Sequence, residues 1–229
     1  MSVTLYGFWR SLAAYRVRVA LNLKGIPFEE ISINLAGGEQ FGEAYSSLNP
    51  QHVVPLLKHD DNEIVQSLAI LEYIEDIWPS PKLIPSNPLD KAEVKALALI
   101  TIADTHPLIV PRVRSFLNNE WGLDEAEQTK WAQHWFTKGN EAIENTLIKL
   151  GKSKTYAFGD EVTIADIALA SHVVGAKLFN VDMSNYPTLN HIFQNCMKLD
   201  SFANAHPLKQ PGAPKQESRF GLRNSLFSV

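Results

Sequence analysis

The spacing of apolar residues changes several times within the first eighty positions, and these changes restrict the folds available to the chain. Residues 3–8 alternate apolar with polar or small side chains, as a strand does. Residues 13–24 place apolar side chains at helical spacing and end at Gly25, a natural helix C-cap. Residues 28–34 return to strand alternation, and residues 39–48 are compatible with a second helix. The pattern therefore predicts two successive strand–helix pairs.

Two short segments rich in β-forming residues follow these pairs and precede another helix. Residues 53–58 and 63–65 lie on either side of a polar turn, and Ser67 precedes an apolar stretch that reaches Trp78. The resulting order of elements is βαβαββα, a mixed sheet flanked by helices. The predicted fold class of this region is α/β, in the thioredoxin-like arrangement.

The pattern changes after Trp78. Residues 79–90 contain four prolines, which indicates a stiff linker. Only helical patterns follow: Pro107 and Pro111 predict a kink in the first long helix, and the Thr163–Asp166 spacing predicts a capping box. We therefore expect a thioredoxin-like domain over residues 1–80, a linker over 81–90, an all-α domain over 91–214 and a tail over 215–229.

Charge and composition argue against several classes of function. The formal net charge of −4 at pH 7 provides no broad basic field for nucleic acid or an anionic membrane surface. The N-terminus lacks the features of a secretory signal, and no apolar run approaches membrane-spanning length. A single cysteine, Cys196, leaves no CxxC pair, and the histidines show no metal-ligand spacing. We expect a cytoplasmic protein with a small-molecule substrate and no metal, nucleic-acid or membrane partner.

Ser11 lies between the first predicted strand and the first predicted helix, where unpaired backbone N–H groups can hold an anion. A hydrogen bond to a charged acceptor contributes about 1.5–3 kcal/mol, against about 0.3–1 kcal/mol from the helix dipole. Together these effects would lower the pKa of a bound thiol from about 8.5 to near neutrality. The alternative is that Ser11 serves only as an N-cap.

Two further features suit a peptide ligand. A cis peptide bond before Pro55 would let the backbone of Val54 pair with an extended peptide. Gln66 and Ser67 begin a helix whose first N–H groups could hold the α-carboxylate of a γ-glutamyl group. With Ser11, these features point to one peptide ligand.

Several motifs, in order, resemble the zeta-class glutathione transferases, which include maleylacetoacetate and maleylpyruvate isomerases. The N-terminal motifs are FWRSLAAYRVRVALNLKGIPFE, NPQHVVPLL and IVQSLAILEYIE, and the C-terminal ones are FGDEVTIADIALA and the segment from YPTL to HPLKQPGAP. The resemblance extends to about Pro214. It implies the glutathione transferase fold, a homodimer, glutathione as cofactor and a place in aromatic amino-acid catabolism.

The resemblance also implies roles for particular residues. Ser11 would stabilise the thiolate, and Arg10 and Arg112 would contact substrate carboxylates, although either arginine could instead form a surface salt bridge. The implied glutathione-binding residues are Ser11, Gln40, Val54, Gln66, Ser67, Asp104 and His106. The implied reaction is addition of the thiolate to the double bond of a cis-enedioate-like substrate, rotation, and elimination to the trans isomer.

Two departures from the family pattern leave alternatives open. The usual Ser-Ser-Cys run is Ser-Leu-Ala here, and Leu178 stands where an arginine is expected to meet the substrate. Lys177 is adjacent, but neighbouring helical positions point about 100° apart. The alternatives are a glutathione S-transferase that conjugates electrophiles and a non-catalytic glutathione-binding scaffold. A thiol–disulfide oxidoreductase is disfavoured because no cysteine lies near the first helix.

Overall fold

A computed structural model of the protein describes residues 2–214, which form two compact units. The first unit comprises residues 2–84 and 197–213, and the second comprises residues 85–196 and 214. The expected division into residues 1–80 and 91–214 therefore differs from the observed one at its C-terminal end, where residues 197–213 group with the first unit. The expected tail 215–229 lies outside the described residues.

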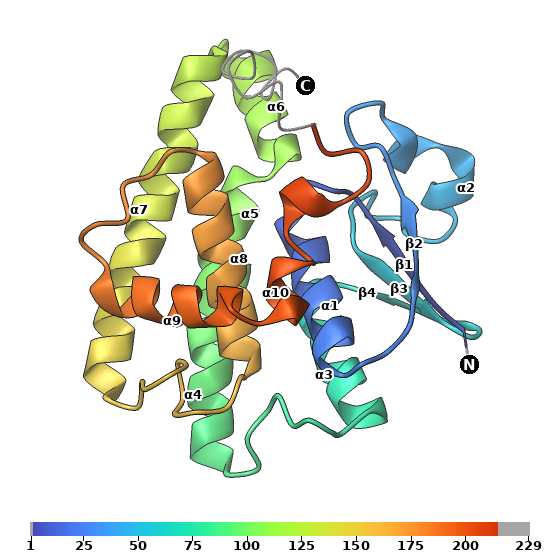
Figure 1. Cartoon of the computed structure of the whole chain (residues 1–229). Coiled ribbons are helices and arrows are strands. Elements are labelled where there is room, and N and C mark those ends of the chain that lie inside the picture. Colours follow the sequence, from blue (N-terminus) through green and yellow to red (C-terminus); the bar gives the residue numbers. More distant parts are fainter. Residues whose placement is uncertain (1, 215–229) are drawn as a thin grey trace. The chain divides into compact units, whose positions relative to one another are not determined.

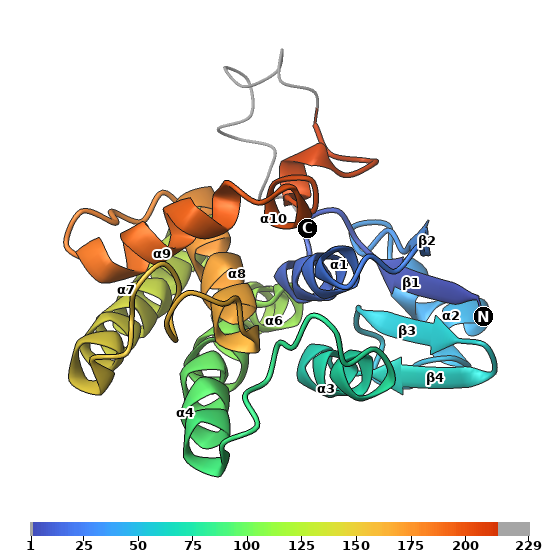
Figure 2. The ribbon, with the colours of Figure 1, turned by 60° about the horizontal axis from the view of Figure 1, so that its bottom comes forward.

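The first unit contains a four-stranded mixed sheet in the order β2-β1-β3-β4 (Figures 1 and 2). β1 pairs in parallel with β2 and antiparallel with β3, and β3 pairs antiparallel with β4. The side chains of β1 alternate between buried and half-buried, as the two-residue period of the sequence predicts. The strands are β1 Val3–Gly7, β2 Glu29–Ser32, β3 Leu56–His59 and β4 Asn62–Val65.

Helices cover both faces of this sheet. α1 (Leu12–Leu23) and α3 (Ser67–Ile77) lie side by side on one face, and the short α2 (Glu43–Ser46) lies on the other (Figure 1). Helix α10 (Asp200–Ala203) packs against α1 and buries Phe202 completely, which explains why the chain after residue 196 belongs to this unit. The predicted thioredoxin-like α/β fold is confirmed.

One predicted helix of the first unit is divided. A single helix over residues 39–48 was expected, but the structure has a 3₁₀ turn at Glu39–Phe41 and then α2. Gly42 separates the two because its backbone is extended, with φ −65° and ψ 146°. Helical spacing of apolar residues does not reveal such a break.

The described part of the second unit is built from helices: α4 Pro88–Leu99, a π-helical segment Ile100–Thr105, α5 His106–Ile109, α6 Pro111–Trp121, α7 Glu125–Leu150, α8 Ile164–Leu178 and α9 Pro187–Met197. α8 is the central helix, and its side chains are buried from Ile164 to Ala176. The predicted capping box at its start is confirmed, with Thr163 and Asp166 bonding reciprocally.

The long apolar stretch that begins at Pro88 corrects one sequence-based expectation. Residues Pro88–Trp121 are long and apolar enough, by length and composition, to meet the criterion for a membrane span, whereas no such run was expected. A core helix of a soluble protein meets the same criterion. The helix is also broken at Val110, whose ψ of 156° is extended, because the residue before a proline is pushed out of the α region.

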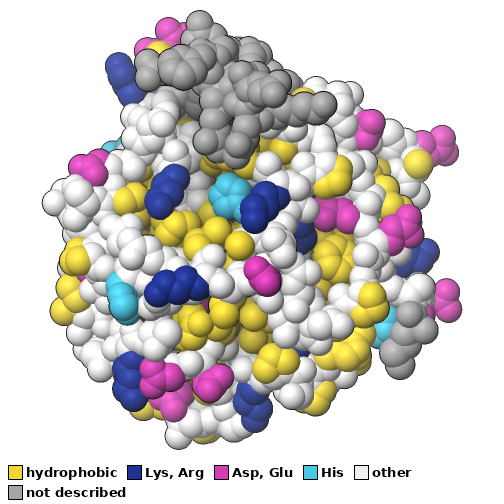
Figure 3. Space-filling model, in the orientation of Figure 1, with side chains coloured by type: hydrophobic (Ala, Val, Ile, Leu, Met, Phe, Trp, Pro, Cys, Tyr) yellow, Lys and Arg dark blue, Asp and Glu magenta, His cyan; other side chains and the backbone are white. Residues whose placement is uncertain are grey.

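Charged side chains of both signs lie on the face of the molecule shown in Figure 3. Lys and Arg side chains are interspersed with Asp and Glu side chains on the face shown in Figure 3, and apolar side chains lie among them. This mixture agrees with the small negative net charge of the sequence.

Candidate active site

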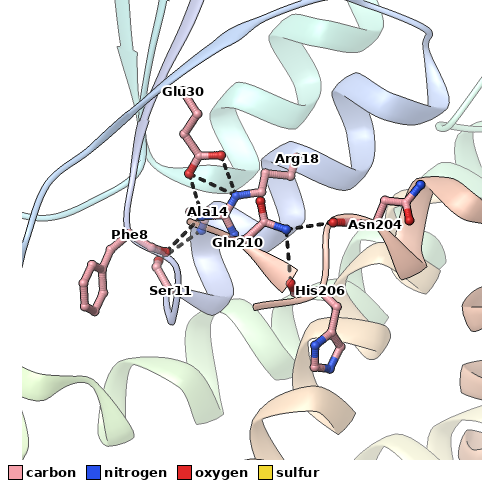
Figure 4. A network of polar contacts seen from close by, with 8 residues as sticks. All are labelled: Phe8, Ser11, Ala14, Arg18, Glu30, Asn204, His206 and Gln210. Carbon is pink, nitrogen blue, oxygen red and sulfur yellow. Dashed lines mark hydrogen bonds and ion pairs between the residues drawn. The ribbon is translucent and has the colours of Figure 1, made fainter. Parts of the chain in front are cut away.

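The turn between β1 and α1 presents Ser11 as the N-cap of α1. Its backbone is extended, with φ −69° and ψ 115°, and its Oγ accepts a hydrogen bond from Ala14 N at 3.1 Å (Figure 4). Ser11 is therefore the N-cap of α1. Capping uses the hydroxyl only as an acceptor, so the hydroxyl proton can still be donated to an anion at the helix N-terminus. The capping and thiolate roles are compatible.

An ion pair between a buried arginine and a half-buried glutamate holds the turn that carries Ser11. Arg18 on α1 donates from Nη2 to Phe8 O at 3.0 Å, and the same carbonyl accepts the backbone N–H of Ser11 at 2.9 Å. The guanidinium also binds the Glu30 carboxylate on β2 through contacts of 2.6–3.0 Å (Figure 4). A charge-assisted pair of this bidentate kind fixes orientation as well as contributing energy.

Gly7 leaves the space that this ion pair requires. A Cβ at Gly7 would lie 2.5 Å from Glu30 Oε1 and 3.4 Å from Arg18 Nη2, so a larger residue would displace the carboxylate. Sequence reasoning missed Arg18 and Glu30. Neither forms a motif, and the two residues meet only when α1, which carries Arg18, packs beside β2, which carries Glu30.

The end of the first unit runs close to the same turn. Gln210 Nε2 donates to the carbonyls of Asn204 and His206 at 2.7 and 3.1 Å, which orders this segment (Figure 4). Two residues later, a Cβ at Gly212 would lie 3.5 Å from Trp9 Cδ1. Residues far apart in the sequence therefore meet beside the β1–α1 turn.

Ser67 is the first residue of α3, and its hydroxyl oxygen accepts hydrogen bonds from a buried arginine on α1. Arg16 on α1 donates from Nε and Nη2 to Ser67 Oγ at 3.1 and 3.0 Å. Both side chains are almost fully buried, and burial lowers the pKa of Arg16 to about 9. Two donors occupy the acceptor positions of Ser67 Oγ, which leaves its hydroxyl to act as a donor. Sequence reasoning did not identify Arg16.

The loop before β3 connects the other expected glutathione residues. Gln66 Nε2 donates to Gln51 Oε1 at 2.7 Å, and His52 Nδ1 lies 3.0 Å from Gln40 O. Gln66 has a positive φ of 72°. Gln40, Gln66 and the Val54 loop are thus held together within the first unit.

Two groups near this loop have unused hydrogen-bonding capacity within residues 2–214. Gln40 Oε1 is buried without a partner, and no described residue hydrogen-bonds to the backbone N–H or C=O of Val54. The Val54 side chain packs on Ile33 and Tyr45, which fixes its backbone. The peptide bond from Val54 to Pro55 is cis, as predicted.

The remaining expected site residues belong to the second unit and are described within it. Asp104 is exposed on the π-helical segment, and His106, which is half-buried, begins α5. Arg112 is exposed on the first turn of α6. Lys177 lies over the Phe193 ring, 4.5 Å from its centroid, so it is engaged within the second unit.

A buried arginine of the second unit was not predicted. Arg114, two positions after Arg112 on α6, is only 6% exposed and lies over the ring of Phe179. A helix turns about 200° over two residues, so the two arginines face in nearly opposite directions. Only the packing of α6 distinguishes the buried arginine from the exposed one.

The only cysteine of the chain is unreactive. Cys196 is buried, and burial raises the pKa of its thiol well above the usual range. A thiol with so small a thiolate fraction is a poor nucleophile.

Known proteins resemble this chain over most of its length. Residues 1–76 match the family described as "Glutathione S-transferase, N-terminal domain". A "Probable maleylacetoacetate isomerase" of Vibrio cholerae is 40% identical over 215 residues, covering 93% of this chain and 99% of that protein.

Two solved structures are similar throughout. The holo structure of a maleyl pyruvate isomerase, described as a bacterial zeta-class glutathione S-transferase, is 38% identical with a TM-score of 0.90, covering 92% of this chain and 100% of that one. A maleylacetoacetate isomerase of Methylobacterium extorquens with bound malonate and GSH is 41% identical with a TM-score of 0.90, covering 93% and 100%.

Proposed function

The chain belongs to the zeta class of the glutathione S-transferase family, and from this premise we propose that it is a glutathione-dependent cis–trans isomerase. The substrate class is a maleylacetoacetate- or maleylpyruvate-like cis-enedioate. The resemblance in sequence and structure to isomerases of both names supports this class.

One observation carries the proposal most directly. Ser11 caps a twelve-residue helix while keeping its hydroxyl proton available as a donor. The hydroxyl and the N-terminus of α1 both favour an anion at this position, so a thiol held there would ionise near neutral pH.

Other residues of the first unit fit the rest of a glutathione molecule. The unpaired backbone groups of Val54 suit the extended peptide, and the donor hydroxyl of Ser67 suits a carboxylate at the N-terminus of α3. Gln66 lies beside Ser67 and would contact the same γ-glutamyl group. Gln40, with its unpartnered Oε1, would bind near the glycyl end.

When bound, glutathione supplies a thiolate that adds to the substrate double bond and leaves after rotation about the resulting single bond. Ser11 stabilises that sulfur before addition and after departure. Arg10 and Arg112 neutralise the substrate carboxylates and the negative charge that develops on addition. Asp104 and His106 supply further polar contacts to glutathione.

A conjugating glutathione transferase is the second candidate. Leu178 provides an apolar side chain where an arginine was expected, and Lys177 is held against Phe193. A transferase that conjugates an apolar electrophile would not require the two arginines that an isomerase uses to bind carboxylates.

The proposal is tested by calorimetric titration with glutathione and by glutathione-dependent isomerisation of maleylacetone, for wild type and Ser11→Ala. We expect Ser11→Ala to raise the pKa of the bound thiol by about one to two units and to lower turnover about 10- to 100-fold. The thiol pKa is followed by thiolate absorbance.

Two controls separate catalysis from helix capping. Ser11→Asp keeps a capping acceptor for Ala14 N but places a negative charge beside the thiolate, so it should fold and be inactive. Asn87→Ala removes the N-cap of α4 and should keep full activity. Isomerisation by Ser11→Ala at the wild-type rate would contradict the proposal, and glutathione conjugation without isomerisation would favour the second candidate.

We also propose that the protein is a cytoplasmic homodimer. Exposed apolar side chains on α3 and α4, Ile77, Leu89 and Leu99, support an interface with a second copy of the chain.

A further inference from the structure

Arg114 is a buried cation with little to balance its charge. The residue is 6% exposed, and its Nε donates to Ile109 O at 3.3 Å. Its guanidinium carbon lies 5.6 Å from the centroid of the Phe179 ring. Among the described residues, none accepts a hydrogen bond from the two terminal nitrogens, and none places a carboxylate at ion-pair distance.

A charge in this position is costly unless an anion accompanies it. Buried arginines are almost always paired, because removing a guanidinium from water is costly and hydrogen bonds to a carboxylate offset that cost. Burial lowers the pKa of Arg114, and the charge of Glu125 on α7 opposes this shift without reaching ion-pair contact. The structure therefore contains a desolvated cation whose usual partner is missing within the described part of the chain.

The surroundings of Arg114 hold its guanidinium in one orientation. Phe179 packs on Phe136, with ring centroids 5.7 Å apart, so the ring beneath the cation is itself fixed. The bond from Nε to Ile109 O fixes the guanidinium edge. A planar cation that is stacked on one face and tethered at Nε offers its remaining N–H groups to a planar anion, and a carboxylate matches them in a bidentate manner.

Resting on the proposed function, we propose that Arg114 binds a carboxylate of the substrate and so selects dicarboxylates. Its guanidinium lies over Phe179, the residue that follows Leu178. Arg114 would thus supply, from α6, the positive charge that α8 lacks at position 178. Arg112 points away from this position on α6 and would serve a different carboxylate.

The test measures malonate binding by calorimetry to the full chain with saturating glutathione. Malonate is the dicarboxylate bound together with GSH in the Methylobacterium structure. In Arg114→Gln we expect the dissociation constant of malonate to rise about tenfold or more, because a hydrogen-bonded charge partner is lost. Glutathione affinity should stay within about twofold of wild type, since that site lies on other residues. Lys149→Gln, an exposed change of the same net charge, should leave both affinities unchanged.

Two further variants separate binding from folding. Arg114→Lys keeps the charge but not the bidentate geometry, and should show an intermediate loss of malonate affinity even if Arg114→Gln fails to fold. Leu178→Arg added to Arg114→Gln should recover part of the malonate affinity, which a purely structural role of Arg114 would not predict.

The outcomes distinguish this inference from the proposed function. Unchanged malonate affinity in a folded Arg114→Gln or Arg114→Lys, or no malonate binding by wild type, overturns the role of Arg114. If wild type binds malonate through Arg114 yet isomerises neither maleylacetone nor maleylpyruvate, the proposed function fails while the carboxylate site stands.

Discussion

Arg16 prepares Ser67 to donate a hydrogen bond rather than accept one. Its Nε and Nη2 both point at Ser67 Oγ, so the serine proton is directed to another acceptor, and a γ-glutamyl carboxylate is suited to that place. The positive charge beneath the serine favours the same anion.

We expect Arg16→Lys to weaken glutathione binding about three- to tenfold, because the charge stays but the paired donors are lost. Calorimetric titration measures the effect, and Ser67→Ala completes a double-mutant cycle. In the Ser67→Ala background, Arg16→Lys should have little further effect. An equally large effect in that background would mean that Arg16 acts on the fold rather than through Ser67.

At the residue scale, the sequence reveals groups whose place along the chain defines their role. Ser11 could be found because it joins a strand to a helix, and Ser67 because it begins one. Arg18 and Arg114 could not, because Glu30 and Phe179 become their neighbours only when separate elements pack. Burial of a charged residue is a property of tertiary structure, and the sequence shows only another arginine.

Helix α8 begins at a capping box that is fully buried. Asp166 accepts from Thr163 N, Thr163 Oγ1 and Ala157 N at 2.8, 2.9 and 2.7 Å. These bonds join the start of α8 to the preceding loop. Burial nevertheless dominates and raises the pKa of Asp166 to about 6.

This raised pKa predicts a dependence of stability on pH. The folded protein holds the Asp166 proton more tightly than the unfolded chain, whose pKa is near 3.8. The contribution of this group to the free energy of unfolding is therefore fully present below pH 3.8 and is lost as the pH rises through about 6. Urea titrations from pH 4 to 7 should show wild type losing stability relative to Asp166→Asn as the pH rises. Parallel curves for the two proteins would contradict the raised pKa.

At the element scale, sequence patterns located helices better than their interruptions. The capping box and the kink near Pro111 were predicted, because both depend on residues adjacent in the chain. The π-helical segment Ile100–Thr105 was not, since its spacing differs from that of an α-helix by one residue per hydrogen bond. The break at Gly42 was missed for a similar reason.

For the whole molecule, the α/β thioredoxin-like and helical character of the two halves followed from hydrophobic periodicity. The grouping of residues 197–213 with the first unit did not, because a helical pattern does not state which surface the helix covers. Only the packing of α10 against α1 reveals it.

The proposed homodimer makes a prediction at this scale. Light scattering after size exclusion should give twice the mass of one chain at micromolar concentration. Leu89→Glu, at a 63% exposed apolar position, should shift the protein towards monomer without unfolding it, because the charge would be buried in an interface. Lys130→Glu, at an exposed position of α7, serves as the control. A wild-type mass of one chain would contradict the homodimer.

The return of residues 197–213 to the first unit also has a consequence for biosynthesis. The first unit is interrupted by the second, since its last helix is encoded after nearly all of the helical unit. A ribosome therefore releases the sheet, α1 and the Ser11 turn long before it releases Phe202, the buried residue of the α10 helix that packs against α1. The unit that carries the Ser11 turn, although translated first, is therefore completed last.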